Sequence, residues 1–286
     1  MQRKAVRKEK LSIFTYFLIF SCFVGITILL YKELNISNGF EEILYQKNIE
    51  SNVEQENKYY INKIKNDYGI IIEYGEDAKS FLSSVNANVQ NDINIVNNNI
   101  KIIYNALKKY PNDVFSIFKN DGYNLHILLV SNFNDNNIAL ASKNSLNQYR
   151  IYLSNDIDFE RAFHHEFFHI LEYYMADKVK YLYYAWNSYN PSGFNYEEDV
   201  SKLTDEFVYN KYATEDENSN TYFLTKYSKV SPREDRAEIF AELMMINKKE
   251  GYLKKGTNIN AKVNYLLNEI YENISISSFH FSTFLD

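Results

Sequence analysis

Residues 165–169 read His165-Glu166-Phe167-Phe168-His169, and this H-E-x-x-H stretch constrains the fold and the chemistry more tightly than any other part of the chain. On an α-helix, positions i and i+4 share one face, so His165 and His169 can meet a single metal ion. Glu166, which follows the first imidazole, can then face a water molecule at that ion. The stretch therefore predicts a helix that carries a zinc site.

The sequence ahead of the motif predicts a small sheet and one long helix. Residues Ser80–Lys109 repeat apolar side chains at helical spacing, and Pro111 ends this pattern. The motif itself falls in a predicted helix over Phe159–Met175, with cap candidates in Asn155–Asp158. Short apolar runs predict the strands Ile70–Ile72, Leu125–Val130, Ile138–Ala141 and Tyr149–Leu153.

A catalytic zinc site needs a third protein ligand, and the chain restricts what it can be. The only cysteine is Cys22, near the N-terminus, so the ligands must be histidines and carboxylates. Ser231, followed by Pro232 and Glu234, is a helix-start signature. In the helix that follows, one face carries Glu234, Glu238 and Glu242, which could serve the metal or form a solvated face.

Two other histidines, His164 and His126, do not have the spacing of a ligand. His164 precedes the motif and is rotated about 100° away on the helix. His126 lies in a predicted buried strand. We expect packing or supporting roles for both.

A glutamate-bearing helix after H-E-x-x-H resembles the gluzincin branch of the zinc metallopeptidases, which use a His-His-Glu site. More narrowly, the run E-D-R-A-E-I-F-A-E, residues 234–242, resembles lethal-factor-like and related bacterial zinc peptidases. The resemblance implies one catalytic Zn²⁺ ion held by His165, His169 and Glu238. Glu234, one turn closer to the helix start, is the alternative third ligand.

The resemblance covers roughly residues 100–245 and extends to two further features. The stretch Trp186–Tyr196 is similar to an aromatic Asn-Pro-x-Gly-Phe segment of the bacterial peptidases. Tyr227 precedes Glu238 by eleven residues, as in those peptidases, whereas lethal-factor-like peptidases have a seven-residue spacing. The implied fold is α+β and zincin-like, with a small N-terminal sheet, an active-site helix and a mostly helical C-terminal part. Its edge strand, which can pair with an extended substrate, is expected at Tyr149–Leu153.

The implied reaction is hydrolysis of peptide bonds in a peptide or protein substrate. Zinc lowers the pKa of bound water toward 7, and Glu166 accepts the water proton and passes it to the leaving amine. Tyr227 would donate a hydrogen bond to the oxyanion. Glu242 could accept the free ring N–H of a ligating histidine, or belong to a solvated face.

The N-terminus predicts a membrane anchor. Residues 11–31 contain no charge over 21 positions, enough helix to cross a hydrocarbon layer of about 30 Å. Residues 1–10 hold five Lys or Arg, which predicts a basic cytoplasmic tail. A cleaved signal peptide is the alternative, although the run is long and ends without small residues. The bulky Phe20 argues against lipidation of Cys22.

The rest of the chain divides into a polar, partly helical stalk over residues 32–68 and a zinc metallopeptidase domain over residues 69–286. The net charge is -6 for the chain and becomes -10 without the first ten residues, which does not suit nucleic-acid binding. We expect a single-pass membrane protein whose catalytic domain is extracellular. The alternative is a non-catalytic cell-surface binding protein on a zincin scaffold, but such a protein would not need Glu166.

Overall fold

The computed structural model describes most of the chain beyond residue 44. The predicted tail and nearly all of the predicted anchor over residues 11–31 lie outside the described residues, and no helix among those described is long and apolar enough to span a membrane. The described residues are 29, 32, 45–135, 137–144, 147–155, 158–178, 183, 185–197, 221–246, 253–274 and 279.

Two compact units make up the chain, Met1–Gln55 and Glu56–Asp286. Within the predicted stalk over residues 32–68, residues 45–68 are helical. Those from Glu56 onward belong to the second unit, where Ile64 is fully buried in the core. Part of the predicted stalk therefore belongs to the second compact unit.

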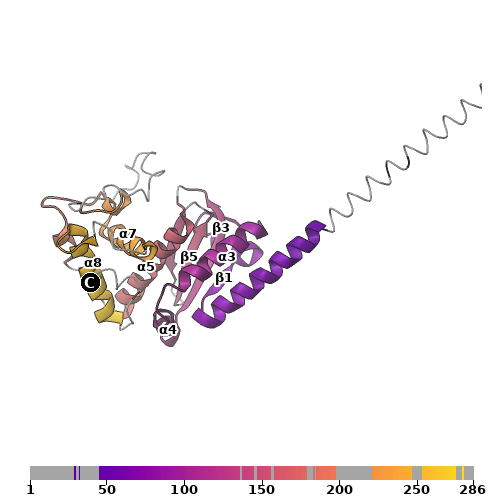
Figure 1. Ribbon diagram of the computed structural model, residues 1–286, viewed down its shortest axis with the longest axis horizontal. Coiled ribbons are helices and arrows are strands. Elements are labelled where there is room, and N and C mark those ends of the chain that lie inside the picture. The colour runs from indigo at the N-terminus through magenta and orange to yellow at the C-terminus, as the bar shows by residue number, and fades with distance from the viewer. Residues whose placement is uncertain are drawn as a thin grey trace, which may run out of the picture. The chain divides into compact units, whose positions relative to one another are not determined.

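The second unit is α+β, as predicted, and contains a mixed five-stranded sheet (Figure 1). Strands β1 (Ile71–Glu73), β3 (Asn124–Phe133) and β5 (Gln148–Ser154) run parallel, with β3 between β1 and β5. Strand β4 (Ala139–Lys143) runs antiparallel to β5, and β2 (Ala87–Val89) runs antiparallel to β3.

The prediction of an edge strand at Tyr149–Leu153 is wrong, because these residues lie in β5, between β3 and β4. Successive residues of β5 are buried on both faces of the sheet, including Ile151, Tyr152 and Leu153, which is typical of a central strand. The edge beyond β5 is formed by β4.

The prediction of a single helix over Ser80–Lys109 is also wrong, because the structure has α2 (Gly75–Leu82), then β2, then α3 (Ile93–Leu107). Asn86 adopts a left-handed φ of 52°, which a continuous helix does not allow. Asp92 then begins α3 by accepting hydrogen bonds from the backbone N–H of Asn94 and Ile95. The apolar spacing continued across this break, so periodicity alone did not reveal it.

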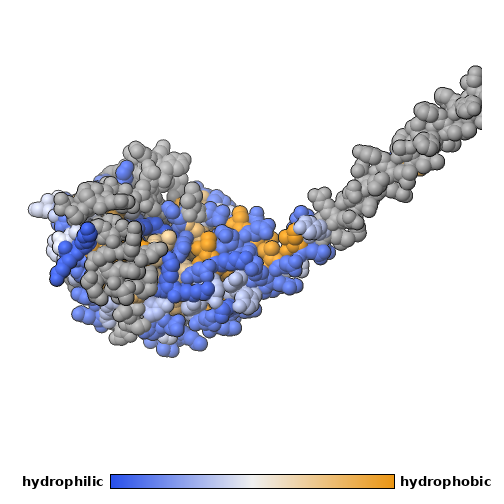
Figure 2. Space-filling model, in the orientation of Figure 1, coloured by the Kyte–Doolittle hydropathy of each residue, from blue (hydrophilic) through white to orange (hydrophobic). Residues whose placement is uncertain are grey.

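Helices cover both faces of the sheet, and successive side chains of β3 point to opposite faces. Ile127 belongs to the cluster built with α3, α4 (Asp113–Asn120) and α5 (Phe159–Lys178), whereas Leu128 belongs to the cluster built with α2. On its other side α5 packs against α7 (Pro232–Met245), which also contacts α8 (Asn258–Ile274). On the face shown in Figure 2, hydrophilic residues cover most of the described surface.

Candidate metal centre

Helix α5 presents the two imidazoles of the H-E-x-x-H motif side by side. The helix spans Phe159–Lys178, close to the predicted bounds. His165 and His169 are 2% and 4% exposed, with ring centroids 4.9 Å apart and ring planes at 86°. Their Nε2 atoms therefore share one small, nearly dry region against α7.

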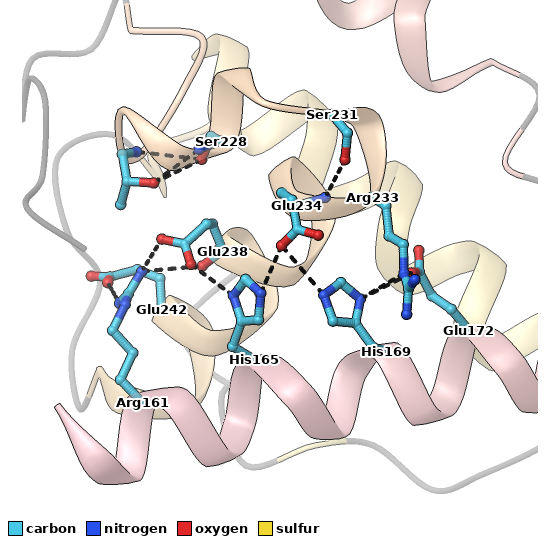
Figure 3. Close-up of polar contacts among 11 residues, drawn as sticks. Arg161, His165, His169, Glu172, Ser228, Ser231, Arg233, Glu234, Glu238 and Glu242 are labelled. Atoms are coloured by element: carbon cyan, nitrogen blue, oxygen red, sulfur yellow. Dashed lines mark hydrogen bonds and ion pairs between the residues drawn. The ribbon is translucent and has the colours of Figure 1, made fainter. Parts of the chain in front are cut away.

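Helix α7 brings a carboxylate to both rings. Ser231 caps the helix as predicted, because its hydroxyl accepts a hydrogen bond from the backbone N–H of Glu234 at 3.2 Å. Glu234 Oε2 then lies 2.9 Å from Nε2 of His165 and 3.4 Å from Nε2 of His169 (Figure 3). One carboxylate oxygen thus meets the same ring nitrogen on each histidine.

The donor set of His165, His169 and Glu234 fits one metal ion. Ligand atoms at zinc distances and tetrahedral angles stand about 3.3 Å apart. One ligand atom from each residue lies within 4.8 Å of the others. Two imidazoles and a carboxylate also match the ligand types that zinc accepts and leave a coordination position for water or substrate.

The electrostatics of the cluster favour positive charge between these ligands. Burial lowers the pKa of His165, but hydrogen bonds to Glu234 and Glu238 outweigh this effect and raise it to about 10. Burial likewise raises the pKa of Glu234, but the two imidazoles hold it well below 4.5. A divalent cation bound between these ligands would balance the same negative charge.

Glu238, the third ligand implied by the sequence resemblance, contacts the opposite side of the His165 ring. Its Oε1 accepts a hydrogen bond from Nδ1 of His165 at 2.7 Å, and its Oε2 accepts one from Nη2 of Arg161 at 3.1 Å. The structure thus brings Glu234 to the Nε2 atoms and places Glu238 where it orients the ring. A carboxylate on the second nitrogen of a ligating histidine fixes its tautomer and ring angle.

Glu242 pairs with an arginine on α5. Its Oε2 accepts a hydrogen bond at 2.5 Å from Nη1 of Arg161, which sits one turn before His165 on α5. Arg161 therefore joins Glu242 to Glu238 and holds the pKa of Glu238 below 4.5, against the opposing effect of burial. This arginine was not among the predicted site residues, although its i−4 position from His165 places it on the same helix face.

The second nitrogen of His169 also has charged neighbours that were not among the predicted site residues. Nδ1 of His169 lies 3.3 Å from Oε2 of Glu172 and 3.0 Å from Nε of Arg233. Oε1 of Glu172 accepts a hydrogen bond at 2.6 Å from Nε of Arg236. The i+3 spacing from His169 to Glu172 was the available signal.

Glu166 and Tyr227, the predicted catalytic residues, both lie close to the cluster. Glu166 is 6% exposed, and within the described part of the chain no side chain hydrogen-bonds its carboxylate. Tyr227 begins the short 3₁₀ helix η3 (Tyr227–Lys229), and its ring centroid is 5.9 Å from that of His165. Burial and then the nearby negative charge of Glu234 raise the pKa of Tyr227 well above 10, so the phenol keeps its proton.

The histidines expected to have packing or supporting roles lie away from the cluster. His164 is fully buried, with Nδ1 2.7 Å from the hydroxyl of Tyr110. His126 lies in β3, with Nδ1 2.9 Å from a carboxylate oxygen of Glu73. Neither joins His165 and His169 in the metal-binding group.

The buried carboxylate of Asp235 connects α7 to the predicted aromatic segment and to α8. Oδ2 of Asp235 accepts hydrogen bonds from Nζ of Lys262 at 2.7 Å, from the Trp186 indole at 3.1 Å and from the Tyr196 hydroxyl at 2.8 Å. Asp235 and Lys262 are both 0% exposed. Because Asp235 follows Glu234 directly, this network also fixes the first turn of α7.

Comparisons with protein family models, curated proteins and solved structures give no match to this chain. Its chemistry must therefore be inferred from its own residues. The most informative are the convergent ligand atoms of His165, His169 and Glu234.

Proposed function

We propose that the protein is a membrane-anchored, zinc-dependent endopeptidase whose catalytic domain lies outside the cell. The observation that carries the proposal is the convergence of Nε2 of His165, Nε2 of His169 and Oε2 of Glu234, with Glu166 next to the first imidazole. This His-His-Glu set resembles that of the gluzincins. With Glu234 as ligand, Tyr227 precedes the ligand by seven residues, the spacing of the lethal-factor-like peptidases.

The residues around the cluster suit hydrolysis of an amide bond. When bound, zinc supplies a Lewis acid that polarises the scissile carbonyl and makes water more acidic. Glu166 accepts a proton from the attacking water and delivers it to the leaving amine. Tyr227, which keeps its proton, donates a hydrogen bond to the oxyanion that develops on the substrate.

The outer edge of β4 supports an extended peptide as the substrate. Backbone hydrogen bonds run from Ser154 to Ile138 and from Asn144 to Gln148. Because inward and outward backbone groups alternate along an antiparallel strand, the N–H and C=O groups of Ala139, Ala141 and Lys143 point away from β5. An extended peptide can add to this edge through backbone hydrogen bonds that do not depend on its sequence.

The N-terminal residues support the proposed location. The uncharged run over residues 11–31 would anchor the chain, and the basic residues 1–10 would stay in the cytoplasm. The metal centre would then act on peptides or proteins outside the cell.

The decisive experiment compares the full-length chain with its Glu166→Gln variant, each purified in detergent and loaded with zinc. We expect the parent protein to cleave members of a peptide library and the variant to lose this activity while it retains zinc. Unchanged cleavage by the variant would overturn the role of Glu166. Zinc binding without cleavage by either protein would favour a non-catalytic binding protein instead.

A further inference from the structure

Arg233 occupies the outer side of the candidate metal centre. It lies in the first turn of α7, directly before Glu234, and its side chain is 38% exposed, whereas that of Glu172 beside it is 9% exposed. Its Nε lies 3.0 Å from Nδ1 of His169 and 3.3 Å from Oε2 of Glu172 (Figure 3). The guanidinium is thus held beside a candidate ligand but remains open to solvent.

A continuous set of contacts joins this guanidinium to the edge strand. Arg233 lies over the ring of Tyr173, 4.5 Å from its centroid. The Tyr173 hydroxyl in turn lies 3.5 Å from the carbonyl oxygen of Ala141, one of the outward-facing groups of β4. A peptide paired with β4 and reaching toward His169 would therefore pass close to Arg233.

The local charge balance leaves this arginine able to bind another anion. Glu172 faces two guanidinium groups, those of Arg233 and Arg236, and its closer contact is with Arg236 at 2.6 Å. Arg236 is only 11% exposed, so Arg233 is the more accessible of the two cations. Nε of Arg233 makes the contacts with His169 and Glu172, and a guanidinium presents a planar fork that suits a carboxylate.

We propose that Arg233 selects substrates that carry an acidic side chain near the scissile bond. This inference rests on the proposed peptidase function and names the substrate class of that same site. The side chain would act on specificity through a charge-assisted hydrogen bond to Asp or Glu of the peptide.

The test uses the zinc-loaded full-length chain and matched peptides that differ only by Glu, Gln or Lys at each of three positions on either side of the cleaved bond. For the parent protein we expect kcat/KM to be roughly tenfold or more higher for Glu than for Gln in at least one position. Arg233→Gln should remove this preference, and Arg233→Glu should shift it toward Lys. Arg236→Gln, which also removes a cation from Glu172, should keep the preference for Glu.

A binding measurement separates specificity from catalysis and from folding. In the Glu166→Gln background, the Glu peptide should bind more tightly than the Gln peptide, and adding Arg233→Gln should equalise the two dissociation constants. Zinc content and the melting temperature identify variants that have simply lost the site. Equal cleavage of Glu and Gln peptides by the parent protein overturns the inference and leaves the peptidase function standing. If the zinc-loaded parent cleaves no peptide, the peptidase function fails and the inference fails with it.

Discussion

Glu238 accepts a hydrogen bond from His165 through Nδ1 at 2.7 Å, while the opposite ring nitrogen faces Glu234 at 2.9 Å. The two glutamates are one turn apart on α7 and hold the same imidazole from both sides. This arrangement separates the residue that would bind the metal from the residue that orients its ligand.

The first prediction distinguishes these two roles by zinc affinity. Glu234→Gln should nearly abolish zinc binding, because it removes a charged ligand. Glu238→Gln should weaken binding by about 10- to 100-fold, as expected for a residue that orients a ligand. Competition titration with a zinc chelator measures both affinities. The reverse order would make Glu238 the third ligand.

The second prediction concerns metal removal. An ion that binds only the folded chain at a free concentration of 100 times its Kd stabilises it by about 2.7 kcal/mol. For a domain of this size, we expect chelation to lower the melting temperature by about 5 to 10 °C. His169→Ala should show little change on chelation, whereas Glu166→Gln should behave like the parent protein. An unaltered melting temperature in the parent protein would contradict a tightly bound ion.

The third prediction tests β4 as the substrate-binding edge. Ala141→Pro removes an outward N–H without breaking a bond to β5, so the fold should persist while kcat/KM for peptides falls by about 2- to 10-fold. Ser142→Pro removes an inward N–H and should lower the stability of the sheet instead. Urea unfolding and peptide cleavage, measured on both variants, separate the two effects. Full activity in Ala141→Pro would count against backbone pairing at this residue.

The fourth prediction is a pH effect on stability. The contact with His164, whose Nε2 lies 3.5 Å from Oε1 of Glu160, and the contact with Lys109 lower the pKa of Glu160 from 4.5 to about 2, although burial opposes them. Because the folded-state pKa is depressed, the stabilisation is present above pH 4.5 and is lost as the pH falls toward 2. Its size is at most about 3 kcal/mol. The stability gap between the parent protein and Glu160→Gln should therefore narrow over this range in urea titrations; parallel curves would contradict it.

The fifth prediction concerns the buried pair of Asp235 and Lys262. Lys262→Met leaves the Asp235 carboxylate without its cation in the interior and should cost about 3 to 5 kcal/mol of unfolding free energy. The double variant with Asp235→Asn should recover part of this loss. Urea unfolding of the three proteins measures the coupling, and strictly additive losses would show that the pair does not act as a unit.

Periodicity and capping chemistry predicted the elements of the candidate site well. The H-E-x-x-H helix and the start of α7 at Ser231 follow from local signals, and the structure confirms both. Local signals could not choose between Glu234 and Glu238, because residues one turn apart share a helix face but lie about 6 Å apart along the axis. That choice depends on how α7 docks on α5, which the ion pairs of Arg161 help to fix.

The position of the edge strand also depended on long-range information. The apolar runs that became β4 and β5 both suit strands, and neither reveals which one pairs on both sides. Strand β4 lies between β3 and β5 in the sequence, but in the sheet β5 pairs with β3 in parallel and with β4 antiparallel. A sequence pattern of period two predicts strands but does not specify which strands pair.

His169 and Glu234 are separated by 65 positions in the chain yet meet across the interface of α5 and α7. An ion held by both residues would act as a reversible cross-link that closes a long loop, and such links disfavour the unfolded chain by reducing its entropy. Because Asp235 follows Glu234, the same link would also strengthen the attachment of Trp186 and Tyr196 to α7. Zinc would thus stabilise the folded protein as well as take part in its chemistry, because it would join two helices from distant parts of the chain.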